Sequence, residues 1–203
     1  MPRKTGPQLT LDEIIEAAAR LLQREGYDRL TMRALADELN VQAPALYWHV
    51  EDKRQLSLLL FDHLIADLDY GAETGDWRAD IQQMMQALRR RLVDTRDITR
   101  LFPDDYSRGP RAIRPLEQAL GVMRRAGFRG SDALQAYGVA LSFVVGWARF
   151  EVTRGANPPA SPSPPPVLFP NLAWALADTP ADPEAGFEFG VALLLDGMER
   201  RRL

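Results

Sequence analysis

The segment TMRALADELNVQAPALYWHV, residues 31–50, predicts two short helices joined by a tight turn. Thr31 is suited to cap the first helix, in which the apolar residues recur at helical spacing: Leu35, Ala36 and Leu39. The second is expected over about 42–50, with Pro44 in its first turn, where a missing backbone N–H costs nothing. Such a pair is typical of a helix-turn-helix, whose second helix enters the major groove of DNA.

A longer helix is predicted on each side of this segment. The first runs from Thr10, which forms a capping-box pattern with Glu13, to Gly26. The second, capped by Asp52, is expected over 53–70, and its leucine stripe can join the N-terminal helices to the rest of the chain. The helix from Thr10, the two helices after it and the longer helix capped by Asp52 together make up the expected DNA-binding unit.

The rest of the chain has helical periodicity except for one proline-rich stretch. Helices are predicted over 76–95, 98–102, 110–126, 131–154 with Ser131 as its cap, and from Pro183 onward. Residues 155–182 are predicted to form a long loop, with one turn of helix at 171–177, because six prolines lie within 157–166. We therefore expect an all-α fold, with a three-helix head at 1–52 and a helical body at 53–203.

The composition is that of an ordinary soluble chain, with 46% hydrophobic and 26% charged residues among 203. The absence of cysteine excludes disulfides and thiolate chemistry, and it suits a reducing cytoplasm. We find no signal peptide pattern, and the longest apolar stretch, 133–148, is shorter than the roughly 18 residues that suggest a membrane span. We therefore expect a cytoplasmic protein without a membrane partner. Because the net charge is −3, cations that meet DNA must gather on one face.

Two sets of residues are more specific than a general helix-turn-helix. The N-terminal set is Thr31 to Ala36, Val41, Pro44, Leu46-Tyr47-Trp48-His49-Val50, Lys53 and Leu56. The C-terminal set is Arg125 to Phe128, Asp132 to Leu134, Phe189-Gly190 and Gly197 to Glu199. Both resemble the tetracycline repressor (TetR) family, and the tetracycline repressors themselves most. The resemblance implies a homodimer with DNA-binding heads and a ligand-binding, dimerising body, which leaves its operator when a small molecule binds.

The resemblance also implies which residues face DNA: Arg33, Gln42, Ala43, Pro44, Ala45, Tyr47, Trp48, His49 and Lys53. Gln42 can read adenine and the three residues after it can contact a thymine methyl, whereas the cations and hydroxyls can bind phosphates. Tyr47 and Trp48 can alternatively close the core of the head, and we expect Trp48 to be partly core and Tyr47 to lie on the surface. His49 as a metal ligand is disfavoured because the other histidine, His63, lies about three and a half helical turns away.

The body has a pattern that suggests close helix packing. Small residues recur every four positions in the helix at 131–154 and again in the last helix: Gly138, Ser142 and Gly146, then Gly186 and Gly190. We expect these helices to pack on each other within or across subunits, with Leu194 and Met198 in the dimer interface. The alternative is that the glycines are incidental and weaken each helix by up to about 1 kcal/mol apiece.

The same helices offer apolar residues for a ligand cavity: Leu88, Phe102, Leu116, Met123, Leu134, Tyr137 and Leu141. A filled core would use the same residues, so both interpretations stay open. The histidines that hold magnesium-bound drug in tetracycline repressors have no counterpart here, where the matching positions are Asp69 and Phe102. We therefore expect an apolar inducer and neither a metal nor a cofactor.

The alternatives to a ligand-responsive repressor are a helical enzyme and a DNA-binding dimer that senses no ligand. A helical enzyme is disfavoured because no nucleophile, base and orienting group stand at a recognisable spacing. A constitutive DNA-binding dimer that senses nothing would have the same head, and only the state of the cavity separates it from a ligand-responsive repressor.

Overall fold

The computed structural model describes residues 9–101, 113–155, 165–177 and 182–202. Within these ranges all regular structure is helical, which confirms the expected all-α class. The helices are α1 (Leu11–Glu25), α2 (Met32–Glu38), α3 (Ala43–Leu46), α4 (Lys53–Leu64), α5 (Trp77–Asp94), α6 (Ile98–Leu101), α7 (Ile113–Arg125), α8 (Gly130–Arg154), α9 (Pro170–Ala177) and α10 (Pro183–Glu199). No helix in the described ranges is long and apolar enough to cross a membrane.

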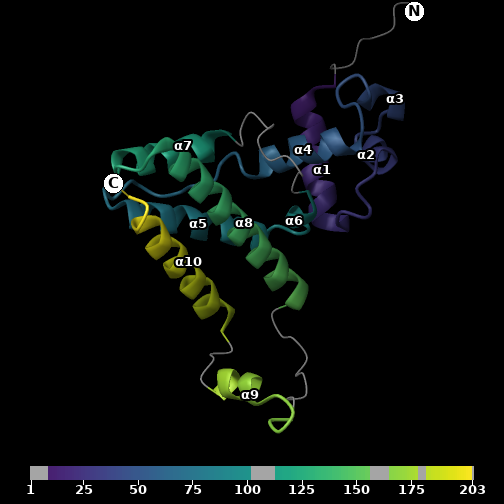
Figure 1. Ribbon diagram of the computed structural model, residues 1–203. Coiled ribbons are helices and arrows are strands. Elements are labelled where there is room, and N and C mark those ends of the chain that lie inside the picture. Colours follow the sequence, from purple (N-terminus) through teal and green to yellow (C-terminus); the bar gives the residue numbers. More distant parts are fainter. Residues whose placement is uncertain (1–8, 102–112, 156–164, 178–181, 203) are drawn as a thin grey trace, which may run out of the picture.

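The helices α1 to α4 pack against one another (Figure 1), and their buried side chains belong to a core cluster that continues into the helices after them. The predicted capping box begins α1: the Thr10 hydroxyl accepts a hydrogen bond from the Glu13 amide at 3.2 Å, and the Glu13 carboxylate accepts one from the Thr10 amide at 2.8 Å. Fully buried leucines come from all four helices: Leu22, Leu35, Leu46, Leu56 and Leu60. Burial of these side chains at about 1.5–3 kcal/mol each holds the short α2 and α3 in place.

The helix α4 is shorter than its leucine pattern predicts, and ends at Leu64 instead of near Tyr70. The guanidinium of Arg91, on α5, donates to the Leu64 carbonyl and to the Asp67 carboxylate. A side chain from another helix thus takes the carbonyl that would continue the helix. The chain then crosses to α5 without regular secondary structure, with Leu68 and Tyr70 still half-buried.

The body consists of α5, α7, α8 and α10 packed together (Figure 1). As predicted, α8 and α10 pack on each other within the chain, although the glycines of α8 do not form the contact. The α8 side of it is Phe143 and Trp147, whose rings lie over Gly190 and Gly186 of α10. Gly138 and Gly146 are exposed on α8, with open space beside them in the described part of the chain. The two helices therefore meet through aromatic rings of α8 that fill the space beside the glycines of α10, and their backbones do not touch there.

A buried cation ties α5 to both helices that flank residues 155–182. Arg89 is only 7% exposed, and its guanidinium pairs with both carboxylate oxygens of Glu151 on α8, at 2.9 and 3.0 Å. It also pairs with Glu184 at the start of α10 and lies 4.7 Å from the centre of the Phe187 ring. Two carboxylates offset the cost of burying this charge, so the ends of α8 and α10 are held together.

Residues 155–182 contain the predicted turn of helix, as α9, which Figure 1 shows set apart from α8 and α10. The start of α8 differs from the prediction, because the helix begins at Gly130 with Arg129 as its N-cap. Ser131 thus stands inside the helix. Arg129 has the extended backbone of an N-cap, and its carbonyl accepts from the Ala133 amide at 2.9 Å.

Gly190→Ala tests the packing of rings into glycine gaps. A Cβ at this position would overlap the Phe143 ring, which cannot move freely because it stacks on Phe187 with ring centres 5.5 Å apart. We expect a loss of about 1–3 kcal/mol in the free energy of unfolding, measured by urea denaturation, although alanine favours helix. The control is Gly121→Ala on α7, where a Cβ makes only an ordinary contact, and a gain of up to about 1 kcal/mol is expected. Equal effects of the two substitutions would contradict the packing interpretation.

Candidate DNA-binding surface and ligand cavity

The expected recognition helix α3 is one turn long and is held by a single buried side chain. Gln42 is its N-cap, and the Gln42 carbonyl accepts from the Ala45 amide at 2.8 Å. Leu46 is 0% exposed, whereas Gln42 and Pro44 are exposed and the two alanines are half-buried. The first residues of α3 therefore present their edge to solvent, as a helix that reads a groove must do.

The aromatic pair after α3 differs from the expectation. Tyr47 is on the surface as predicted, at 53% exposed, but Trp48 is 88% exposed and contributes little to the core. The reason is that α3 ends at Leu46, whose carbonyl accepts from both the His49 and Val50 amides at 2.9 Å. Leu46 and Val50 take the two core positions on either side of this turn, and the turn directs Trp48 outward. A tryptophan left in water beside a candidate recognition helix indicates a binding surface.

The candidate phosphate contacts lie at the starts of α2 and α4. Arg33 is exposed near the start of α2, and His49 is half-buried. Lys53, the first residue of α4, is engaged within the protein: its ammonium lies 4.1 Å from the centre of the Tyr27 ring and donates to the Tyr27 carbonyl at 3.3 Å. The next residue, Arg54, is exposed and was not predicted from the sequence, although a second cation in the first turn of a helix that meets DNA was a usable signal.

A cluster of polar contacts fastens α6 to the end of α1 and the turn after it, and we call this cluster the head–body joint (Figure 1). The Asp97 carboxylate accepts from the Tyr27 amide at 2.8 Å, and Arg96 donates to the Arg24 carbonyl at 2.7 Å. Arg100 pairs with both oxygens of Asp28 at 2.7 and 2.9 Å. This guanidinium lowers the pKa of the Asp28 carboxyl, so the pair is ionised at neutral pH.

The aromatic ring of Tyr27 contacts cations from two other helices in the same joint. Lys53 of α4 lies against this ring, and Arg100 of α6 lies 4.7 Å from its centre. Gly26 has a φ of +86°, which favours glycine, and a Cβ there would lie 2.8 Å from the Asp97 carboxylate. The partners are about 70 residues apart in the chain, so sequence reasoning missed the joint.

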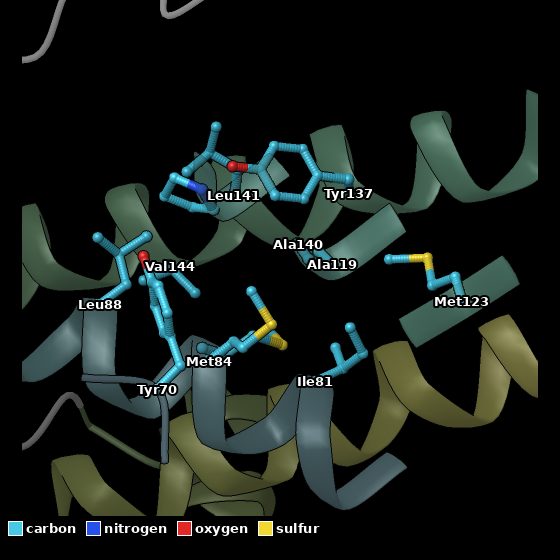
Figure 2. A pocket seen from close by; sticks show the side chains of 12 residues that line it. Tyr70, Ile81, Met84, Leu88, Ala119, Met123, Tyr137, Ala140, Leu141 and Val144 are labelled. Carbon is cyan, nitrogen blue, oxygen red and sulfur yellow. The ribbon is translucent and has the colours of Figure 1, made fainter. Parts of the chain in front are cut away.

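A cavity lies between α5, α7 and α8, and Tyr70 completes its wall (Figure 2). The described residues that line it are Tyr70, Ile81, Met84, Met85, Leu88, Pro115, Ala119, Met123, Tyr137, Ala140, Leu141 and Val144. Its volume is about 40 Å³, room for a few water molecules at most. Burial, with a smaller contribution from nearby Tyr137, raises the pKa of Tyr70, so its phenol is neutral.

The cavity includes four of the seven residues predicted to line it: Leu88, Met123, Tyr137 and Leu141. Leu134 is 55% exposed because Ala133 takes the buried position in the first turn of α8, and its predicted place in the lining is wrong. Leu116 is half-buried on α7, but Pro115 and Ala119 of the same helix line the cavity instead. Phe102 lies outside the described residues.

The candidate dimer residues divide between one surface and the core of the chain. Gly138, Ser142 and Gly146 are exposed on α8, whereas Leu194 is half-buried and Met198 is buried. Gly186 and Gly190 are occupied by the aromatic rings described above. Large apolar residues that were not predicted are exposed on the same two helices: Val139, Phe150, Phe189 and Leu193.

Among the residues that the structure describes, histidine, aspartate and glutamate side chains do not gather in groups of three or more that could hold a metal ion. Asp69, at one of the two matching positions, accepts a hydrogen bond from the Gly71 amide at 2.8 Å and lies on the surface.

Two family models match the chain, and together they cover all but the end of α4 and the linker after it within 14–202. Residues 14–59 match the bacterial regulatory proteins of the tetR family, and residues 71–202 match the tetracyclin repressor-like C-terminal domain. The first match covers the helix-turn-helix, and the second covers the cavity and the α8–α10 packing.

Similar proteins extend over nearly the whole chain. An HTH-type transcriptional regulator of Saccharopolyspora erythraea is 34% identical over 96% of this chain and 86% of its own. The class A tetracycline repressor from transposon 1721 of Escherichia coli is 32% identical, over 97% of this chain and 93% of its own. The solved structure of the Streptomyces coelicolor protein ActR in complex with actinorhodin superposes with a TM-score of 0.85 at 27% identity, covering 97% of this chain and 98% of the other.

The head with its exposed aromatic pair, the body with its cavity and the two family matches all agree with the resemblance in the sequence. The chain belongs to the tetR family of bacterial regulatory proteins, and it is a DNA-binding transcriptional regulator.

Proposed function

We propose that the protein is a homodimeric repressor that leaves its operator when a small apolar molecule enters the cavity of the body. In this proposal residues 1–52 form the DNA-binding head, residues 53–203 form the ligand-binding and dimerising body, and the protein works in the cytoplasm without catalysing a reaction. The observation that carries the DNA-binding part is the 88% exposure of Trp48 beside α3. Together with the exposed Tyr47 next to it, this indole forms an apolar surface beside α3 that a partner can cover.

In this proposal some residues of the head recognise base edges and others bind the phosphate backbone of DNA. Gln42 can pair with an adenine edge, and Ala43, Pro44 and Ala45 can contact thymine methyl groups, so α3 reads few bases. Arg33, Tyr47, Trp48, His49 and Arg54 then hold the head on the phosphate backbone. Lys53 joins them only if DNA draws its ammonium away from Tyr27, because the two are in contact in the absence of DNA.

The exposed face of α8 and α10 is the surface that we assign to the dimer. Gly138 and Gly146 leave room on α8 for a close approach, and Val139, Phe189 and Leu193 supply apolar area around them. Two identical faces related by a twofold axis bury this area and place two heads at a fixed spacing. Operator half-sites about 34 Å apart, one helical turn of DNA, require that spacing.

The head–body joint provides a route from the cavity to the head. Four cavity residues lie on α5, which leads through Thr95 directly into α6. A ligand that shifts α5 therefore moves Asp97 and Arg100, which hold the turn of Tyr27 and Asp28. Ligand and DNA then favour different positions of α6, and each weakens the binding of the other.

The small volume of the cavity supports one rival, a constitutive repressor in which these residues are only a filled core. The two are separated by a thermal-shift screen against a broad set of apolar compounds. Ligands that raise the melting temperature and release operator DNA are expected for the proposed function. A screen that finds none favours the constitutive repressor.

Trp48→Ala tests the DNA-binding surface. Because the indole is almost fully solvated, we expect an unchanged melting temperature and an affinity for operator DNA at least about tenfold lower in a gel-shift titration. Trp174→Ala is the matched control, since Trp174 on α9 is 77% exposed and lies away from the head. A Trp48 variant that binds as tightly as the control would show that the contact surface lies elsewhere.

Leu193→Arg tests the dimer surface. A cation in the centre of an apolar interface is unpaired and desolvated, so we expect a monomer in size-exclusion chromatography with light scattering. Operator affinity should fall by about a hundredfold or more, because the paired heads are lost. The same substitution at Ile113, exposed on α7, should leave the mass and the affinity unchanged. A dimeric Leu193 variant would exclude this face as the interface.

Asp97→Ala tests the joint. It leaves the half-buried Tyr27 amide without its acceptor, at a cost of about 1–3 kcal/mol. We expect faster hydrogen exchange at residues 20–30, unchanged exchange in α8, and a weaker effect of ligand on operator binding. Asp94→Ala, at an exposed position near the end of α5, is the control. Unchanged exchange around Tyr27 would mean that the joint does not hold the head.

A further inference from the structure

Lysine is rare in this chain, and one of its two positions is the first residue of α4. Among 25 lysine and arginine residues, lysine occurs only as Lys4 and Lys53, and all the others are arginine. Arginine makes the stronger, two-pronged contact with a phosphate, whereas the lysine ammonium is a compact charge whose three donors can serve different partners. Position 53 therefore carries a cation suited to exchange between partners.

In the structure the Lys53 ammonium is held by the turn after α1. It lies 4.1 Å from the centre of the Tyr27 ring and donates to the Tyr27 carbonyl at 3.3 Å, and both residues are half-buried. The guanidinium of Arg100 lowers the pKa of the Asp28 carboxyl, and the Lys53 ammonium adds to this shift. The ammonium is thus within electrostatic range of that carboxylate as well. Ring, carbonyl and carboxylate all stabilise the cation in this place.

The same ammonium belongs to a helix that begins at the candidate DNA-binding surface. Lys53 follows the exposed Trp48 by five residues, and the first turn of α4 favours anions through its backbone N–H groups and its dipole. The head has few other cations to offer, since Arg24 is already paired with Glu38 at 2.7 Å. A phosphate of bound DNA therefore competes with Tyr27 for the Lys53 ammonium.

We propose that Tyr27 is a positioning residue that limits the affinity for DNA, because its ring and carbonyl keep the Lys53 ammonium from the phosphates until DNA displaces them. The ring contributes more than bulk, since an aromatic face attracts a cation and an aliphatic side chain does not. Arg100 of α6 lies 4.7 Å from the centre of the same ring, so the helix that follows α5 takes part in placing it. This inference rests on the DNA-binding part of the proposed function and requires no ligand.

Removal of the ring tests the proposal, because a purely structural role predicts the opposite sign. Tyr27→Leu keeps the backbone carbonyl and an apolar side chain but loses the cation–π contact. Affinity of the full-length protein for a duplex selected from a random pool should therefore rise about two- to fivefold in a gel-shift titration. Tyr27→Phe keeps the aromatic face and should bind like the unaltered protein. Lower or unchanged affinity in Tyr27→Leu would overturn the proposal.

A double-mutant cycle shows whether Tyr27 acts through Lys53. Lys53→Gln removes the charge, so affinity should fall and the slope of log K against log salt should become shallower by about 0.9. In that background Tyr27→Leu should change the affinity by less than about twofold. Arg54→Gln is the matched control, because it removes the neighbouring exposed cation and should leave the effect of Tyr27→Leu intact. Equal effects of Tyr27→Leu in both backgrounds would show that it acts by another route.

The Lys53 side chain can be followed directly, because the chain contains only two lysines. In protein labelled with ¹³C at lysine alone, Lys53→Gln identifies the NMR signals of Lys53. The face of the Tyr27 ring should move the Lys53 Hε signals upfield of their position in Tyr27→Leu. Saturating DNA should remove this upfield shift from the unaltered protein, since the ammonium moves to a phosphate. A shift that persists on DNA would mean that Lys53 stays on Tyr27, and would refute the competition.

The selection of the duplex separates the two levels of inference. A random pool from which the unaltered protein selects nothing would overturn the proposed function and the role of Tyr27 together. Selection and retardation of a duplex, with additive effects in the double-mutant cycle, would overturn the role of Tyr27 alone.

Discussion

The hydrogen bond from the Tyr27 amide to the Asp97 carboxylate is the contact on which the functional arrangement depends. It joins the turn after α1 to the start of α6, two segments about 70 residues apart, and the Arg96 and Arg100 contacts flank it. The ion pair of Arg100 with Asp28 is exposed, so water and salt screen it and on its own it contributes little to stability. Its contribution is to geometry, because several modest contacts made by α6 and the turn before it fix how α1 and the turn after it lie against this segment.

Local features of the sequence predicted the helices well, because the signals that start and end them are local. The capping box at Thr10, the caps at Thr31, Asp52 and Asp76, and the break at Gly155 all appear where the side chains or the glycine demand them. One clear error arises where a distant residue intervenes. The end of α4 at Leu64 depends on Arg91, and no periodicity within α4 can reveal that contact.

The site was harder to predict than the fold, since which face of a helix is buried depends on its neighbours. Trp48 was expected to be partly core, and its exposure follows from a turn that gives the core positions to Leu46 and Val50. Leu134 was expected in the cavity, and Ala133 takes the inward position instead. In both cases the residue type indicated an apolar side chain. Which side of the helix or turn faces the core is set by tertiary packing, and spacing in the sequence does not reveal it.

The small volume of the cavity also has a consequence for regulation. If the cavity must open before a ligand fits, the free energy of opening is subtracted from the intrinsic affinity of the ligand. The opened state is useful as a signal only if it differs from the closed state at α6, because a ligand that binds two states equally shifts neither. The position of Leu88, which lines the cavity and lies on the helix that leads into α6, meets this condition. The methionines in the cavity wall change conformation at low cost, so the free energy of binding a small molecule is enough to open the cavity. The head–body joint then converts the opening into a displacement of Tyr27, and the head moves with it.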